Sequence, residues 1–202
     1  MRNLFKNTVL ATLMAAGISS AMAAGGSGAQ VFVHGDVKPV ACTMGAGADG
    51  PKDVDLGGWA VSDFKTGTGD YANLYTVAES KQVFTVTATG CSGVGPTENG
   101  KLNLVIDEST PMRSTEKKIF GDAAKANGTT AGFTLEASDN GVDVQRLLKA
   151  GDEIVLHKFT SGEDMNAANG SSINFTTMMA ADNPTPGAGH VEAPVTFSVN
   201  YK

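Results

Sequence analysis

The chain has 202 residues, of which 41% are hydrophobic, 18% charged and 6% aromatic, with 25 Gly, 7 Pro and 2 Cys. This length suits one domain or a small pair of domains. The 15 Lys and Arg against 21 Asp and Glu give a net charge of −6. This balance argues against nucleic-acid binding, because such binding needs Lys and Arg side chains that neutralise phosphates. Few aromatic residues and many Gly, Thr and Asn residues favour an all-β chain of strands and turns.

The first 23 residues have the layout of a secretory signal peptide. A basic start with Arg2 and Lys6 precedes an apolar run over residues 9–18 and small residues that end at Ala23. We expect cleavage after Ala23, which removes two cations and changes the net charge from −6 to −8. The apolar run is about half of the roughly 20 residues that a membrane-spanning helix needs, so we expect export without a membrane anchor.

The two cysteines, Cys42 and Cys91, both lie after this segment. An even number of cysteines in an exported chain favours a disulfide, and two buried free thiols are the alternative. A structural zinc site needs four Cys or His ligands at close spacing, whereas His34, His157 and His190 are far apart in the sequence. We therefore predict a disulfide and no metal site.

Alternation of apolar and polar residues predicts most of the strands. Residues 24–30 hold no large apolar side chain and have the composition of a flexible segment, and residues 45–58 are predicted to form a loop. Only residues 115–126 and 143–150 suit short helices. The predicted strands cover residues 31–40, 83–89, 101–107, 132–137, 153–157, 173–178 and 195–201.

Asn-Gly pairs occur beside these strands, at Asn99, Asn127, Asn140 and Asn169. Asn-Gly suits the positive φ angles of tight turns and therefore favours antiparallel hairpins. The polar segment 108–130 is predicted to form a long surface loop. Short strands joined by such turns are typical of a β-sandwich.

No motif in the sequence supports catalysis. The spacing of residues 95–101 matches a phosphate-binding loop, but Leu102 stands where a Ser or Thr would ligate magnesium, and the segment lies between two predicted strands. The acidic pair Asp152 and Glu153 follows Gly151 and is explained by a solvated turn. A secreted β-sandwich metalloenzyme would need clustered histidines, which the chain lacks. We predict no enzyme activity, no catalytic residues and no cofactor.

The chain that remains after cleavage begins and ends with regular alternating strands. A strand of this kind exposes an apolar face unless another element covers it. The two faces consist of Val31, Val33, Gly35 and Val37 near one end, and of Val195, Phe197, Val199 and Tyr201 near the other.

With the two cysteines, these segments resemble the major structural subunits of chaperone–usher fimbriae of the type 1 kind. The resemblance extends over the chain after the signal peptide. It is carried by Val31-x-Val33-x-Gly35-x-Val37, by Cys42, by Phe84-Thr-Val-Thr-Ala-Thr-Gly-Cys91, by Gly132-Phe-Thr-Leu, by Ile173-Asn-Phe-Thr, by Pro186-Gly187, by residues 193–200 and by the penultimate Tyr201.

The resemblance implies an incomplete immunoglobulin-like β-sandwich, the pilin fold, over residues 39–202. Such a sandwich lacks its last strand, and residues 24–38 would be a donor-strand extension that completes a neighbouring subunit. A periplasmic chaperone would first fill the open groove, and an outer-membrane usher would then exchange its strand for the extension of the next copy. The result would be a homopolymer built by β-strand addition.

When the family's roles are transferred to the matching positions of this chain, the N-terminal face would supply the donor strand. The C-terminal face would line the groove and contact the chaperone. Val31, Val33 and Val37 would fill pockets, and Gly35 would permit close backbone approach. Gly35 also suits a β-bulge, and Tyr201 also suits a core tyrosine, so both alternatives stay open. The groove residues would be Val195, Phe197, Val199 and Tyr201.

The resemblance implies a structural subunit of an adhesive fimbria on the bacterial surface, with a role in cell adhesion. The exposed loops of such a subunit can also bind a host receptor. The alternative is a minor pilin or a carbohydrate-binding adhesin. A tip adhesin usually carries a lectin domain before its pilin domain, and the 179 residues after Ala23 leave little room for one.

Overall fold

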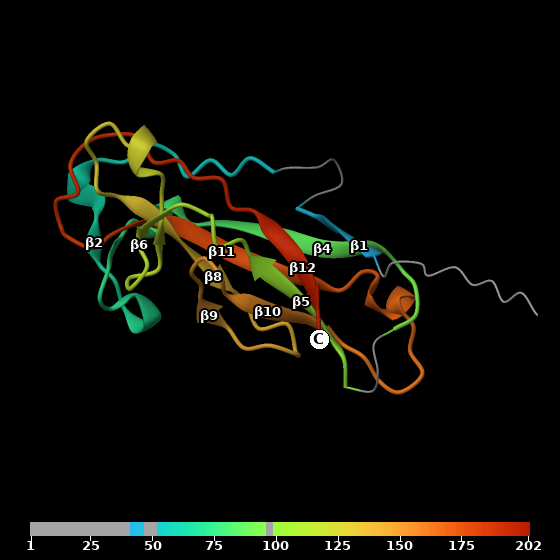
Figure 1. The fold of residues 1–202 in the computed structure, drawn as a ribbon. Helices are drawn as coiled ribbons and strands as arrows, with labels where there is room; N and C mark the ends of the chain where they lie inside the picture. Colours follow the sequence, from blue (N-terminus) through green and yellow to red (C-terminus); the bar gives the residue numbers. More distant parts are fainter. Residues whose placement is uncertain (1–40, 47–51, 96–98) are drawn as a thin grey trace, which may run out of the picture. The chain divides into compact units, whose positions relative to one another are not determined.

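The computed structural model describes residues 41–46, 52–95 and 99–202. The chain divides into two units between Val37 and Lys38, and all described residues belong to the second. In this part, the strands form one sheet of nine strands and one of three (Figure 1). The described residues contain no α-helix. The predicted all-β fold is confirmed.

The larger sheet is antiparallel and has two long strands at its centre, β4 (Gln82–Ser92) and β11 (Ser172–Ala181). Its main path runs through β1 (Ala41–Gly45), β4, β11, β8 (Gly132–Ala137), β7 (Ile119–Phe120) and β6 (Met112–Ser114). Three short strands extend the sheet: β2 (Lys65–Thr66), β3 (Tyr75–Thr76) and β9 (Arg146–Leu147). β2 pairs with β3, β3 pairs with β11, and β9 pairs with β8.

The smaller sheet has the order β10-β5-β12 and is also antiparallel. Its central strand is β5 (Lys101–Ile106), flanked by β10 (Glu153–Lys158) and β12 (Phe197–Tyr201). Each of these strands lies at a position where alternating residues predicted one.

The strand order is that of an immunoglobulin-like sandwich. In the constant-type arrangement, one sheet has the order ABED and the other CFG. Here β1-β4-β11-β8 reproduce A-B-E-D, and β5-β12 reproduce C-F. Among the described residues, no strand pairs with the second edge of β12, which is the position of strand G. The described residues therefore form an immunoglobulin-like sandwich in which none of them fills the position of strand G.

Aromatic rings join the two sheets in the core. Phe175 of β11 is fully buried, and its ring centroid lies 5.3 Å from that of Phe84 on β4 and 5.0 Å from that of Phe197 on β12. Since β12 belongs to the smaller sheet, this stack connects the sheets across the core. The other fully buried large residues include Leu102, Leu104, Ile106, Phe120, Leu135, Leu148, Ile154 and Ile173.

The two predicted helices are wrong. Residues 115–126 contain β7 and a short 3-10 turn, and residues 143–150 contain β9. Phe120 is buried and pairs with Phe133 of β8, so a contact distant in sequence decides the local conformation. The predicted polar loop over residues 108–130 is wrong for the same reason, because β6 and β7 join the larger sheet. The 3-10 turns are η1 (Val61–Asp63), η2 (Gly69–Tyr71), η3 (Ala78–Ser80), η4 (Ala123–Lys125) and η5 (Met165–Ala168).

The Asn-Gly pairs form turns, but only two of them connect paired strands. Asn99 and Asn127 have positive φ angles of 67° and 45°, whereas at Asn140 and Asn169 the following glycine takes the positive φ. The turns at Asn127 and Asn140 link neighbouring strands of the larger sheet. Those at Asn99 and Asn169 carry the chain from one sheet to the other. The hairpin prediction is therefore half correct.

Candidate functional site

The terminal strand β12, red in Figure 1, has an apolar face that the domain covers only in part. The side chains on this face all pack against the main core cluster, yet each remains partly exposed. Thr196 and Ser198, which alternate with them, are exposed. The residues of this face are Val195, Phe197, Val199 and Tyr201, as the sequence predicted, with Val195 two residues before the strand begins.

The pairing of β12 with β5 is complete along its length. Phe197 lies opposite Ile106 and Tyr201 opposite Leu102. Beyond the strand, the backbone amide of Lys101 donates to the Lys202 carbonyl at 2.6 Å, and the Lys202 amide donates back at 3.0 Å. One edge of β12 is thus fully used, and the partial exposure of its apolar face does not come from a poor fit to β5.

Strand β1 lies beside β12 as the edge strand of the larger sheet. Its alternate residues Cys42 and Met44, and Ala46 just after the strand, also pack partly buried against the main core. Two edge strands, one from each sheet, therefore present half-buried apolar side chains over the same core. We call this surface the β1–β12 seam, and it consists of Met44, Ala46, Val195, Phe197, Val199 and Tyr201.

Tyr201 places a polar group inside the seam. Burial raises the pKa of its hydroxyl. The hydroxyl oxygen is buried and has no hydrogen-bond partner among the described residues. A buried unpaired hydroxyl costs free energy, so a polar group that entered the seam at this point would gain a bond.

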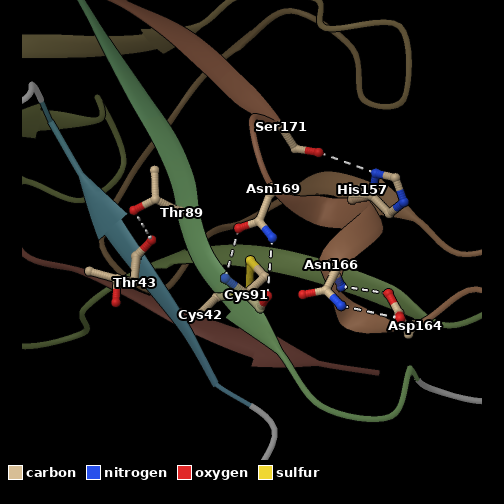
Figure 2. Close-up of a disulfide and its surroundings, with 9 residues drawn as sticks. All are labelled: Cys42, Thr43, Thr89, Cys91, His157, Asp164, Asn166, Asn169 and Ser171. Carbon is tan, nitrogen blue, oxygen red and sulfur yellow. Dashed lines mark hydrogen bonds between the residues drawn. A yellow bond between two sulfur atoms is a disulfide. The ribbon is translucent and has the colours of Figure 1, made fainter.

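A disulfide fixes β1 to β4, as predicted from the cysteine count. Cys42 and Cys91 are bonded, and their Cα atoms lie 4.0 Å apart (Figure 2). Both cysteines belong to the same sheet, since β1 and β4 are antiparallel neighbours. The side of the seam that β1 provides is therefore covalently attached to the interior of the larger sheet.

Asn169 holds the end of β4 next to this disulfide (Figure 2). The Cys91 amide donates to Asn169 Oδ1 at 2.8 Å, and Asn169 Nδ2 donates to the Cys91 carbonyl at 3.1 Å. The side-chain amide thus replaces the backbone of a neighbouring strand. Sequence reasoning identified Asn169 only as a turn residue, and no spacing in the sequence indicates that it contacts Cys91.

The predicted donor-strand residues Val31, Val33, Gly35 and Val37 lie outside the described residues, as do the predicted signal peptide and the extension over residues 24–38. Within the described ranges, no group of three His, Cys, Asp or Glu side chains could hold a metal ion. No helix in that part of the chain is long and apolar enough to cross a membrane.

The comparisons with known proteins agree with this geometry. No curated protein matches the chain. A family model described as fimbrial protein matches residues 31–202, a range that includes both cysteines, all described strands and the β1–β12 seam. The chain therefore belongs to the fimbrial protein family, which assigns it the role of a pilus subunit.

Proposed function

We propose that the chain is a shaft subunit that polymerises by donor-strand exchange. In this proposal, the β1–β12 seam accepts a strand from one neighbour, and residues 24–38 are donated to the next. The observation that carries the proposal is the apolar face of β12, which packs on the core and stays half-buried although its pairing with β5 is complete.

Strand addition would use both features of the seam, the backbone of its edge strands and its half-buried apolar side chains. An added strand would pair its backbone with an edge strand, which supplies affinity, and would insert alternate side chains over the core, which fixes its register. Contacts of this kind are head-to-tail, and repeated head-to-tail contacts build an open filament where the rotation between neighbours does not close a ring. A fimbrial shaft is such a filament.

The donor residues follow from the alternation near the N-terminus. Val31, Val33 and Val37 would cover Phe197 and its neighbours in the seam, and Gly35 would allow the two backbones to approach. A periplasmic chaperone would occupy the seam during export, and an outer-membrane usher would replace it with the donor strand. The fibre would stand on the bacterial surface and contribute to adhesion.

The test is denaturant unfolding of the exported chain, with its disulfide oxidised, in the presence of a peptide of residues 24–38. A ligand that binds only the folded state stabilises it by about 2.7 kcal/mol at about 100 times its Kd, so the unfolding midpoint should rise with peptide concentration. A peptide that carries Val33→Asp is the matched control and should leave the midpoint unchanged.

Two variants of the chain locate the binding. Val199→Asp places a charge in the seam and should abolish the peptide effect, whereas Ser198→Asp places it on the exposed face of the same strand and should preserve it. A midpoint that is indifferent to the peptide in the unsubstituted chain would reject the proposal.

A further inference from the structure

The outer edge of β10 is capped at Glu153 and Val155 by three loop side chains, which we call the edge cap. They are Asn140, Asp143 and Arg146. The Val155 amide donates to Asp143 Oδ2 at 2.9 Å, and Asn140 Nδ2 donates to the Val155 carbonyl at 2.9 Å. Arg146 Nη2 donates to the Glu153 carbonyl at 2.5 Å. Side chains therefore take the hydrogen bonds that a further strand would take.

The backbone groups of β10 that the cap contacts are those that point away from the neighbouring strand β5. In an antiparallel strand, the amide and carbonyl of one residue point to the same side, and the side changes at each residue. The groups that the cap satisfies belong to Glu153 and Val155, two residues apart. A strand that tried to pair with β10 would need the same groups.

The edge cap is itself rigidly held. Asn140 Oδ1 accepts from the amides of Val142 and Asp143 at 3.1 and 2.8 Å. Asp143 Oδ1 forms an ion pair with Arg146 Nη1 at 2.6 Å. Desolvation raises the pKa of Asp143, but hydrogen bonds from Arg146, Val155 and Val144 outweigh it and hold the pKa below its ordinary value. The cap thus keeps its charged acceptor on the Val155 amide at neutral pH.

The two edges of the smaller sheet therefore differ. The β10 edge is closed by the cap, and the β12 edge borders the half-buried seam. An unprotected strand edge is a template for pairing with another chain, and a polymer of identical subunits places many such edges at high local concentration.

We propose that the edge cap confines strand addition to the β12 edge, so that a second copy of this chain cannot add at β10. This inference rests on the proposed function. Growth at one edge per subunit gives an unbranched fibre, whereas growth at both edges would give branches or amorphous aggregates. Asn140, Asp143 and Arg146 are then the residues that determine where a neighbour is accepted.

The test compares the exported chain with the double variant Asn140→Ala/Asp143→Ala while the seam is filled by excess peptide of residues 24–38. Sedimentation velocity measures self-association, and amide hydrogen exchange measures protection at Val155. The double variant should self-associate although the seam is filled, and Val155 should exchange about tenfold faster, as expected when a net hydrogen bond is lost.

Val144→Ala is the matched control, because Val144 is 65% exposed in the same loop. It should remain monomeric with peptide present. Asp143→Asn keeps an acceptor for the Val155 amide and should also resemble the unsubstituted chain. If the double variant does not fold, as judged by near-UV circular dichroism, the single variant Asp143→Ala takes its place.

A double variant that stays monomeric would overturn the proposal, even with faster exchange at Val155, because the cap would then be a local contact without influence on assembly. Failure of the peptide to bind the unsubstituted chain would instead reject the proposed function. In that case, self-association of the cap variant without peptide would still show that the β10 edge had been opened.

Discussion

Strands β11 and β12 look alike in sequence but have different surroundings. Both alternate apolar and polar residues around a phenylalanine, Phe175 in one and Phe197 in the other. β11 is paired on both edges, by β4 and β8, and Phe175 is fully buried. Among the described strands, β12 is paired by β5 alone, and Phe197 is only partly buried. Alternation therefore specifies a strand and its inward face, but the number of neighbours is set by topology.

The sharpest test of this difference removes one ring from each strand. Phe175→Ala should lower the free energy of unfolding by about 3–5 kcal/mol, because it leaves a cavity in a closed core. Phe197→Ala should cost about 1–2 kcal/mol, because less of that ring is removed from water in the folded chain. Denaturant unfolding of both variants measures the two losses, and equal losses would show that β12 is as closed as β11.

The next test acts on the β1 side of the seam. Replacing both cysteines, as Cys42→Ser/Cys91→Ser, should lower the free energy of unfolding by about 2–4 kcal/mol, since the unfolded chain regains the freedom that the cross-link removed. The unsubstituted chain under reducing conditions is the control and should lose a similar amount. An unchanged midpoint in both would mean that the backbone pairing of β1 and β4 suffices to hold this edge.

A smaller effect is expected at the C-terminal end of β4, where Asn169 contacts Cys91. Asn169→Ala should cost about 1–3 kcal/mol, because it leaves the backbone amide of buried Cys91 without a partner. Asn166→Ala is the matched control, since its side-chain amide donates to Asp164 Oδ2 in the same segment at 3.2 Å (Figure 2). Thermal unfolding distinguishes them, and equal midpoints would remove Asn169 from the account of how β4 ends.

The smallest effect concerns the outer face of β12. Glu153 of β10 accepts from Lys202 Nζ at 2.6 Å and from Asn200 Nδ2 at 3.2 Å, and these contacts lower the pKa of its carboxyl. A lowered carboxyl pKa stabilises the fold above the unfolded value of about 4.3, and this contribution is lost as pH falls through the folded pKa. Glu153→Gln should therefore unfold slightly earlier at pH 7, and its difference from the unsubstituted chain should shrink as the pH falls below the unfolded value. A difference that grows toward acid would contradict this sign.

How much the sequence predicts depends on the length of each strand. The long strands, such as β4 and β11, contain several repeats of the two-residue apolar–polar alternation, and both were predicted. Strands of two residues, such as β7 and β9, are too short to show a period. Phe120 forms a bridge because Phe133 lies beside it, and Gly132 permits this crossing, since a Cβ there would lie 2.1 Å from the Phe120 carbonyl oxygen.

The features of the candidate site likewise divide into those that the sequence predicted and those that it did not. The inward residues of the terminal strand and the disulfide were predicted, because alternation and cysteine count are local or compositional signals. The clamp of Asn169 on Cys91 and the cap of Asp143 on Val155 were not, because each joins a loop side chain to a backbone group that only the folded topology brings near. The role of the N-terminal segment remains a prediction.

The position of the disulfide also decides how the subunit would carry a load. In a fibre assembled as proposed, tension would enter each subunit through the donated segment that precedes β1. Cys42 is the second residue of β1, and its bond to Cys91 passes the force directly to β4, in the interior of the larger sheet. The hydrogen bonds of β1 then cannot be pulled apart one by one from that end. The covalent bond stands where peeling would otherwise begin.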